Sequence, residues 1–251
     1  MIKRKTWTVT EPWRNTSAGE AFSSFDKVFA LSGPPVSQDK VSLVFCVCID
    51  GQRYYVKQYH STKGIRSWFG LSRIRQEARN QLWFSRIGLP AAQVVAYGEE
   101  HILSRTFRGG MITASVDDTR DLAWMATNQP DLFKSRPWVN QVINQVAEIT
   151  RTLHQHHFCH NDLKWRNLLV SQELESPQVY LIDCPVGQRF FGPFFDSRII
   201  KDLACLDKVG RRALSKTQRL RFYKEYRQCK VLSGRDREII TKVLVYFKGR
   251  D

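Results

Sequence analysis

The sequence lacks any long hydrophobic run, because no stretch approaches the roughly 18 uninterrupted apolar residues of a membrane-spanning helix. Its basic start, MIKRKTWTVTEPW, also lacks the apolar core of a signal peptide. The six cysteines are not at the spacings of a disulfide framework, so we expect reduced thiols and a cytosolic protein. Internal repeats and low-complexity segments are absent as well. The sequence thus predicts a folded globular chain that is neither secreted nor membrane-spanning.

Acidic residues are scarce. The chain has 24 Asp and Glu residues against 39 Lys and Arg residues, which gives a formal net charge of +15. Such an excess predicts a polyanionic partner, namely nucleic acid, an anionic membrane surface or a phosphorylated substrate. The charge alone does not distinguish these three.

The first part of the chain is rich in strand signals. Residues 41–49 (VSLVFCVCI) and 53–59 (RYYVKQY) flank Asp50-Gly51, which predicts a β-hairpin. Residues 72–87 have helical periodicity and stop at Gly88 and Pro90, and two short strands are expected at 93–97 and 102–107. We therefore expect an N-lobe over residues 1–106, with a β-sheet and one helix.

The second part is mainly helical. From Pro137 to about His156 the apolar residues recur at helical spacing, and the region after about Ser197 reads as helices with Ser215 and Ser233 as N-caps. Between them, residues 168–170 and 179–182 are short apolar strands. The predicted fold class is α+β and bilobal, with an antiparallel-sheet N-lobe followed by a mainly helical C-lobe over residues 107–251.

The most informative stretch is LHQHHFCHNDLKWRNLLV, at residues 153–170. Asn167 follows Asp162 by five residues, and His160-x-Asp162-Leu163 precedes it, which is the spacing of a kinase catalytic loop. In that chemistry an aspartate accepts a hydrogen bond from the acceptor hydroxyl, and a neutral amide holds a magnesium ion. This spacing predicts Asp162 and Asn167 as site residues.

Three more residues extend the pattern. Asp183 ends an apolar strand sixteen residues after Asn167, where a carboxylate can bind Mg²⁺ that bridges the phosphates of ATP. Upstream, Lys57 lies in the second hairpin strand and Glu77 in the next helix, so that a lysine can reach phosphates and a carboxylate can hold it. Each residue alone is commonly a plain surface residue, and the prediction rests on their order along the chain.

Clustered histidines beside Cys159 invite a zinc interpretation. Zinc ligands at these spacings would need a second cluster, and the remaining histidines are His60 and His101 alone. The sequence therefore argues against a structural zinc site.

These motifs resemble the lipopolysaccharide kinase (Kdo/WaaP) family of the protein-kinase-like superfamily, whose members phosphorylate heptose or 3-deoxy-D-manno-octulosonic acid (Kdo) of the lipid A-core. The resemblance spans about residues 41–226, and LHQHHFCHNDLKWRNLLV, VYLIDCP, Lys-Asp-Leu-Ala (residues 201–204) and SKTQRLRFYKEY carry it. It implies an ATP- and Mg²⁺-dependent phosphotransferase. The implied roles are catalytic base for Asp162, magnesium ligands for Asn167 and Asp183, phosphate contact for Lys57 with Glu77 as its partner, and a brace of the catalytic loop for Asp202.

The sequence departs from the protein-kinase pattern at three places. Asn161 stands where most protein kinases have arginine, so an activation phosphate would find no such partner. Cys184-Pro185 replaces the Phe-Gly that follows the magnesium aspartate, which suggests a less mobile segment. No GxGxxG precedes Lys57, and Gly33-Pro34-Pro35 with the residues after it is the only candidate for a phosphate-covering loop.

The acceptor is expected to be a small or glycolipid molecule, because the interval from Asp183 to Asp202 is short and has no APE-like anchor. Residues 208–230 contain nine Lys or Arg and one acid, Glu225, and residues 63–86 contain six against Glu77 around Trp68-Phe69-Gly70-Leu71. Such basic segments are commonly just surfaces exposed to solvent. The alternative interpretation is that they bind an anionic glycolipid acceptor and associate peripherally with the cytoplasmic face of the bacterial inner membrane. A nucleic-acid partner is not expected.

Three other functions remain open from the sequence. A kinase-like antibiotic or choline phosphotransferase would share the site, although its cationic acceptor calls for an acidic pocket. A protein kinase directed at tyrosine or serine would incorporate phosphate into protein. A non-catalytic nucleic-acid-binding module would use the charge, but no nucleic-acid motif is recognisable.

Overall fold

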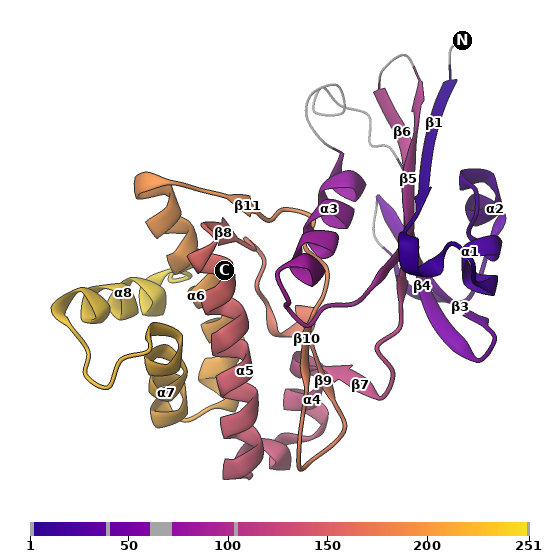
Figure 1. Cartoon of the computed structure of the whole chain (residues 1–251). Helices are drawn as coiled ribbons and strands as arrows, with labels where there is room; N and C mark the ends of the chain where they lie inside the picture. Colours follow the sequence, from indigo (N-terminus) through magenta and orange to yellow (C-terminus); the bar gives the residue numbers. More distant parts are fainter. Residues whose placement is uncertain (1–2, 39–40, 61–71, 103–104, 250–251) are drawn as a thin grey trace. The chain divides into compact units, whose positions relative to one another are not determined.

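The computed structural model describes residues 3–38, 41–60, 72–102 and 105–249 (Figure 1). It divides the chain into two compact units, Met1–Asp117 and Asp118–Asp251. The first is built on an antiparallel sheet and the second is mainly helical, as the sequence predicts. The boundary differs from the predicted one after residue 106. That position falls inside strand β6 (Arg105–Ala114), whose paired glycines interrupt the apolar pattern from which the strand end was inferred.

In the described residues of the first unit, six antiparallel strands form one sheet in the order β1-β5-β6-β4-β3-β2. The predicted hairpin is present, and Asp50 (φ 49°) and Gly51 (φ 79°) both adopt the left-handed conformation that a two-residue hairpin turn requires. The strands are β1 Lys3–Val9, β2 Pro35–Gln38, β3 Ser42–Ile49, β4 Gln52–His60, β5 Val94–Ile102 and β6.

Helices cover both faces of this sheet. The short helices α1 (Ser17–Ala21) and α2 (Phe25–Ala30) cover one face, and α3 (Arg73–Arg86) covers the other, so the prediction of a single helix in this part of the chain was wrong. Two neighbouring glycines of β6 show the division: a Cβ atom at Gly109 would meet Ile74 of α3, whereas one at Gly110 would meet Phe29 of α2. The predicted helix over 72–87 is confirmed, with the Ser72 side chain capping its N-terminus.

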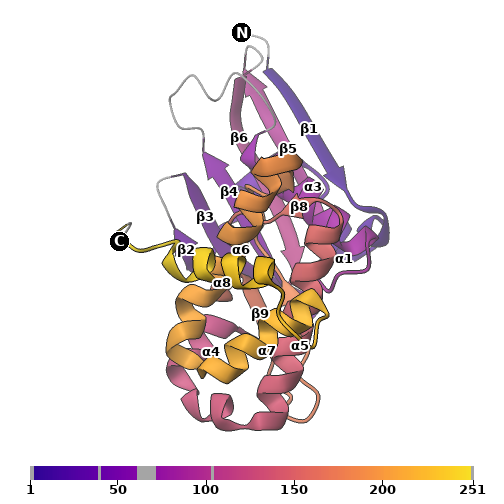
Figure 2. The ribbon, with the colours of Figure 1, turned by 90° about the vertical axis from the view of Figure 1, so that its left-hand side faces the viewer.

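The second unit is organised around the long helix α5 (Arg136–Gln155; Figure 2). Its buried residues form the apolar stripe that the sequence predicted. Helix α7 packs against α5, and α8 packs against α6. The remaining helices are α4 Leu122–Asn128, α6 Gly192–Ala213, α7 Lys216–Arg227 and α8 Gly234–Val245, with 3-10 turns at Pro130–Lys134 and Trp165–Asn167. Strands β7 (Thr119–Asp121), β9 (Leu168–Ser171) and β10 (Val179–Leu181) form a small sheet, and β8 (Phe158–Cys159) pairs with β11 (Gln188–Arg189).

Among the residues that the structure describes, no helix combines the length and the apolar character that crossing a bilayer requires.

Both predicted N-caps, Ser215 and Ser233, form capping boxes. At the second one, the buried Asp236 accepts hydrogen bonds from the Ser233 hydroxyl (2.6 Å), from Tyr223 Oη (3.0 Å) and from Arg227 Nε (3.0 Å). These donors, the Ser233 hydroxyl first, lower the pKa of Asp236 from 3.8 to about 2, against the opposing effect of burial. One carboxylate thus joins α7 to α8.

This network predicts a specific acid sensitivity. Because the folded-state pKa of Asp236 lies below its unfolded value, the stabilisation is complete above about pH 4 and is lost as the pH falls towards 2. Asp236→Asn should therefore reduce the decline in the free energy of unfolding between pH 4 and pH 2 by on the order of 1 kcal/mol, measured by urea unfolding. Glu238→Gln, at an exposed position of the same helix, should leave the decline unchanged, and equal slopes for wild type and Asp236→Asn would contradict the assignment.

Candidate active site

In the first unit, the structure brings Lys57 and Glu77 together. Lys57 Nζ lies 2.8 Å from Oε1 and 3.0 Å from Oε2 of Glu77, and Tyr59 Oη donates a further hydrogen bond of 2.7 Å to Oε2. The side chains of Lys57 and Glu77 are only 16% and 2% exposed. Burial, followed by the charge of Glu77, raises the pKa of Tyr59, so this phenol remains a donor. A carboxylate this deeply buried is stable because a cation and a hydroxyl both donate to it.

The scaffold fixes both members of this pair. Lys57 lies in β4, which is paired on one side with β3 and on the other with β6. Ile74, one turn before Glu77, and Ala78, the residue directly after it, pack with Tyr59 and Met111 in a buried cluster. The same cluster that holds α3 on the sheet therefore positions Glu77.

In the second unit, Asp162 is partly exposed in the loop between β8 and β9. Lys164 Nζ lies 2.6 Å from Oδ1 of Asp162, and Arg166 lies 3.6 Å from Oδ2. Sequence reasoning missed Lys164 as a site residue, although its position two residues after the aspartate was visible. Its ammonium group neutralises the Asp162 carboxylate in the structure.

Asn167 and Asp183 lie at the same end of the β9–β10 ribbon. Leu181 pairs with Leu168, and the Ile182 amide donates to the Asn167 carbonyl at 3.0 Å, which places the residues just before β9 beside those just after β10. Asn167 Nδ2 donates to the Asp162 carbonyl at 2.8 Å, so its Oδ1 is the atom left for another ligand. An amide oxygen and a carboxylate at one ribbon end form a hard-oxygen donor set that fits Mg²⁺.

His160 is a buried structural part of this loop. Desolvation lowers the pKa of its ring, and the nearby carboxylates of Asp202, Asp162 and Asp183 oppose this shift. The neutral form is therefore favoured at physiological pH, and we do not assign it an acid–base role.

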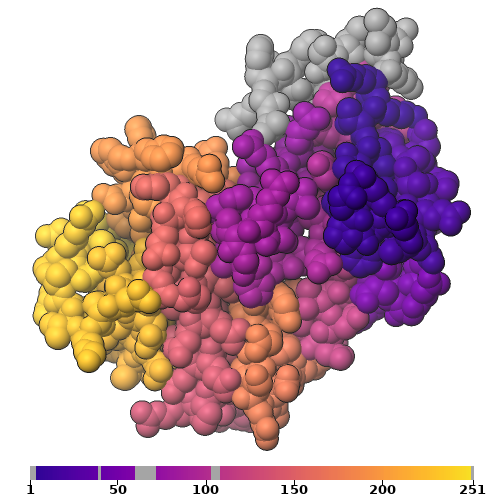
Figure 3. Space-filling model, viewed as in Figure 1, coloured from indigo at the N-terminus to yellow at the C-terminus, as the bar shows by residue number. Residues whose placement is uncertain are grey.

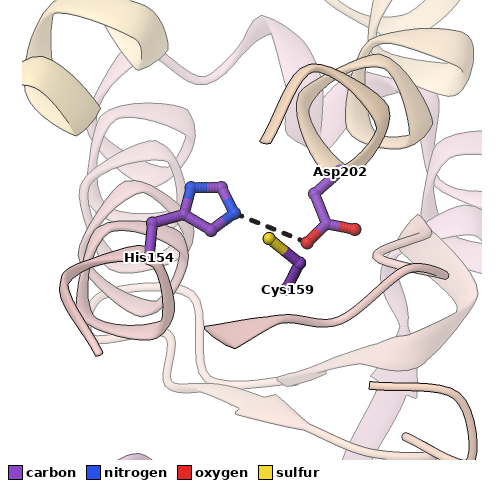
Figure 4. A group of neighbouring side chains, drawn as sticks. All are labelled: His154, Cys159 and Asp202. Atoms are coloured by element: carbon purple, nitrogen blue, oxygen red, sulfur yellow. Dashed lines mark hydrogen bonds and ion pairs between the residues drawn. The ribbon is translucent and has the colours of Figure 1, made fainter. Parts of the chain in front are cut away.

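Asp202 of α6, which Figure 4 draws beside His154 and Cys159, braces the loop that carries Asp162. Its two carboxylate oxygens accept the backbone N–H groups of His160 and Asn161, each at 2.8 Å, and its side chain is fully buried. His154 Nε2 lies 3.4 Å from Oδ2, while Nδ1 of the same ring lies 2.9 Å from Tyr226 Oη. These hydrogen bonds form a chain from α7 through α5 and α6 to the loop that carries Asp162.

His154, Cys159 and Asp202 also place three potential metal-ligand atoms within 4.8 Å of one another. The carboxylate, however, already accepts hydrogen bonds from two backbone N–H groups. Burial raises the pKa of the Cys159 thiol, which disfavours the thiolate form that metals bind. These contacts favour a brace over a metal centre.

Asn161, which replaces the usual arginine, has a role that the sequence did not reveal. It is buried in the left-handed region (φ 64°), and its Nδ2 donates to the Val186 carbonyl at 3.0 Å. Val186 follows Cys184-Pro185, and β11 then pairs with β8. The segment after Asp183 is thus tied to the loop that carries Asp162 by a side-chain hydrogen bond and by strand pairing.

Other predicted features are placed differently or fall outside the described residues. Gly33 packs against β3, where an added Cβ would lie 3.1 Å from the Cys46 carbonyl, so its role is close packing. Residues 39–40, which follow β2 in the sequence, and the segment Trp68-Phe69-Gly70-Leu71 lie outside the described ranges. Within 208–230, four arginines form ion pairs: Arg211 and Arg219 with Asp207 (3.0 and 2.7 Å), Arg221 with Glu225 (3.9 Å) and Arg227 with Asp236 (3.0 Å).

The brace gives a stability prediction. Asp202→Ala would leave two buried backbone N–H groups without an acceptor, at a cost of about 1–3 kcal/mol each. We expect a loss of about 3 kcal/mol or more in the free energy of unfolding, measured by urea titration. Asp196 lies on the same helix as Asp202 and forms an exposed ion pair with Arg235 of α8. Asp196→Ala should therefore cost at most about 1 kcal/mol, and similar losses in the two variants would refute the brace.

Known proteins resemble this chain in sequence and in fold. Residues 37–226 match the profile of the lipopolysaccharide kinase (Kdo/WaaP) family. The chain is 27% identical over 135 residues to a 3-deoxy-D-manno-octulosonic acid kinase of Actinobacillus succinogenes, covering 54% of this chain and 49% of that protein. It is 23% identical to a protein of the same name from Mannheimia succiniciproducens, again over 135 residues that cover 54% of this chain and 49% of that protein. The chain thus spans about half the length of the curated relatives it matches.

A solved structure of WaaP in complex with acyl carrier protein has the same fold. The two chains superpose with a TM-score of 0.69 at 20% sequence identity, over 98% of this chain and 97% of the other. At this identity the likeness concerns the fold.

Proposed function

Because the chain belongs to the lipopolysaccharide kinase (Kdo/WaaP) family, we propose that it transfers phosphate from ATP to a hydroxyl of Kdo or heptose in the lipopolysaccharide inner core. The observation that carries the proposal is the Asp162–Asn167 loop with Asp183 at the adjoining ribbon end. Together these residues supply a base and two hard-oxygen ligands.

The division of labour follows from the contacts. Asp162 accepts a hydrogen bond from the attacking sugar hydroxyl and orients it towards the phosphorus. Lys164 lies 2.6 Å from that carboxylate. From there its ammonium group would balance the negative charge of the phosphoryl group that is transferred. Lys57, held by Glu77 and Tyr59, contacts the phosphates of ATP.

Asn167 Oδ1 and the Asp183 carboxylate would hold Mg²⁺. Bound Mg²⁺ neutralises charge that develops on the phosphates during transfer. The left-handed conformation of Asp183 (φ 57°) is uncommon for a residue other than glycine, and such conformations concentrate at functional sites.

The site residues give the first test of this function. Asp162→Ala should lower kcat by about 10²- to 10⁴-fold with little change in the KM for ATP, and Asp183→Ala should abolish Mg²⁺-dependent turnover. Both substitutions lie outside the buried brace, so cooperative unfolding should persist. The measurement is transfer of labelled phosphate from ATP to purified lipopolysaccharide core, and normal turnover in Asp183→Ala would remove this residue from the site.

Mass spectrometry of the core from a strain without this protein tests the substrate class. We expect loss of one phosphate, about 80 Da, restored by wild type and not by Asp162→Ala. An unchanged core combined with phosphate incorporation into protein would instead favour a protein kinase.

We further propose that the protein works at the cytoplasmic face of the bacterial inner membrane, where an anionic glycolipid acceptor would lie. Support comes from the cations of residues 208–230 that have no carboxylate partner among the described residues, Arg212, Lys216, Lys224 and Lys230. Exposed cations near an anionic surface contribute about 1 kcal/mol each and are screened by salt.

A cavity of about 390 Å³ in the second unit supports a partner with an acyl chain. Its walls are mainly apolar side chains of α5, α6, α7 and α8, and its volume is within the usual range for small-molecule sites. The Nε1 atom of Trp138, which lines it, is buried and has no hydrogen-bond partner among the described residues. A lipid acceptor or an acylated carrier protein would supply such a chain.

The membrane proposal predicts a division among the basic residues. Replacing Arg212, Lys216, Lys224 and Lys230 together by glutamine should weaken binding to vesicles with anionic lipid at least tenfold, while the free energy of unfolding changes by less than about 1 kcal/mol. A control that removes the same charge, at Arg14, Lys27, Arg120 and Lys134, should bind nearly as wild type. Equal losses in both variants would mean that net charge alone drives binding, and wild-type binding that is insensitive to salt would also contradict the proposal.

A further inference from the structure

A separate groove lies in the first unit, on the face of the sheet that α3 covers. It encloses about 310 Å³ between α3, the edge strand β1 and the neighbouring strand β5. The helix contributes side chains at steps of four, three and four residues, which is the spacing of one helix face. Its lining consists of Arg75, Arg79, Leu82 and Arg86 from α3, Thr6 and Thr8 from β1, and Tyr97, Gly98 and Glu99 from β5.

One end of this groove is already neutralised. The buried Glu99 lies with Oε2 3.7 Å from Arg75 Nε and 3.1 Å from His101 Nε2. In the sheet register Glu99 is opposite Thr6, so this end is formed by Arg75, Glu99 and Thr6. An anion would find little net positive charge there.

The other end is different. Helix α3 runs from Arg75 towards the loop that leads into the start of β5, so Arg79 and Arg86 lie further along, towards the Thr8–Tyr97 pair of the register. Among the described residues, neither arginine has a carboxylate partner, and neither the Thr8 hydroxyl nor the Tyr97 phenol has a hydrogen-bond partner. Both arginines are exposed, and Figure 3 views the molecule from a side on which α3 (purple) and β1 (indigo) are both visible.

The side chains at this end define the ligand chemistry. Guanidinium groups pair with phosphate through two parallel hydrogen bonds, and hydroxyl groups donate to the remaining oxygens. All cations in the lining are arginines, and the volume is at the lower end of the range for small-molecule sites. We propose that this groove binds a phosphate monoester, held by Arg79 and Arg86 with the hydroxyls of Thr8 and Tyr97.

Such a ligand would act on the helix that carries Glu77. A phosphate that contacts both α3 and β1 links the helix to the edge of the sheet, and Glu77 projects from the same helix to Lys57. Occupancy is expected to reduce the opening of α3 and so hold the Lys57–Glu77 ion pair. This effect on catalysis rests on the proposed function, whereas binding at the groove does not.

Calorimetry with glucose 6-phosphate tests the site, with Mg²⁺ and a saturating non-hydrolysable ATP analogue present to block the nucleotide site. Wild type should bind, and the double variant Arg79→Gln, Arg86→Gln should bind at least tenfold more weakly. Thr8→Val should lower affinity by a smaller factor. Arg73→Gln removes an exposed arginine of the same helix outside the groove and should bind as wild type.

A parallel titration with phosphatidylcholine vesicles that contain phosphatidic acid distinguishes a lipid headgroup from a soluble ester. Binding that depends on Arg79 and Arg86 in either titration supports the site. The probe that binds shows whether the ligand is a lipid headgroup or a soluble ester. The proposal is overturned if wild type binds neither probe, or if the double variant binds both as tightly as wild type.

Hydrogen exchange of the α3 amides tests the coupling to Glu77. With ligand bound, exchange should slow in wild type and not in the double variant. Unchanged exchange at saturating ligand would overturn the coupling to Glu77.

Discussion

The carboxylate of Asp202 is a charge that the second unit can bury only if the catalytic loop supplies its hydrogen bonds. Transfer of an ionised group into a protein interior costs several kcal/mol unless donors replace the lost water. The donors are the backbone N–H groups of His160 and Asn161, with the ring of His154 beside them. Helix α6 and the loop that carries Asp162 therefore stabilise each other, and neither is expected to keep its conformation without the other.

The strained backbone of the loop is understandable from this constraint. Asn161 adopts a left-handed conformation that costs about 1 kcal/mol or more, and it places its amide on Asp202 and its side chain on Val186. The first unit solves a similar problem with other groups, since buried Glu77 is satisfied by Lys57 and Tyr59. Each unit thus holds its chemically important residues through one buried carboxylate whose partners come from other elements.

What the sequence reveals is mostly what is local. The Asp50-Gly51 hairpin, the helix capped by Ser72 and the capping boxes at Ser215 and Ser233 depend on residues a few positions apart, and their patterns were readable. Strand β1 was missed because its alternation, KRKTWTV, becomes informative only beside β5, more than 80 residues away. The order of Lys57, Glu77, Asp162, Asn167 and Asp183 indicated the candidate site. The contacts of Asn161 with Val186 and of His154 with Tyr226 could not be predicted, because they join segments that only the tertiary fold brings together.

The net charge of +15 shows the same limit, since a count of basic residues does not say which of them are available. Arg219 and Arg227 serve the packing of α6, α7 and α8 through Asp207 and Asp236, and Arg75 is engaged by Glu99. The cations left over differ in kind between the two units. Of the four without carboxylate partners in the described part of 208–230, three are lysines, compact charges on flexible stems that suit a diffuse anionic surface. The two available cations of the α3 groove are arginines, whose rigid forks suit one bound phosphate. The choice of side chain thus argues for two anionic partners of different geometry rather than for one uniformly basic surface.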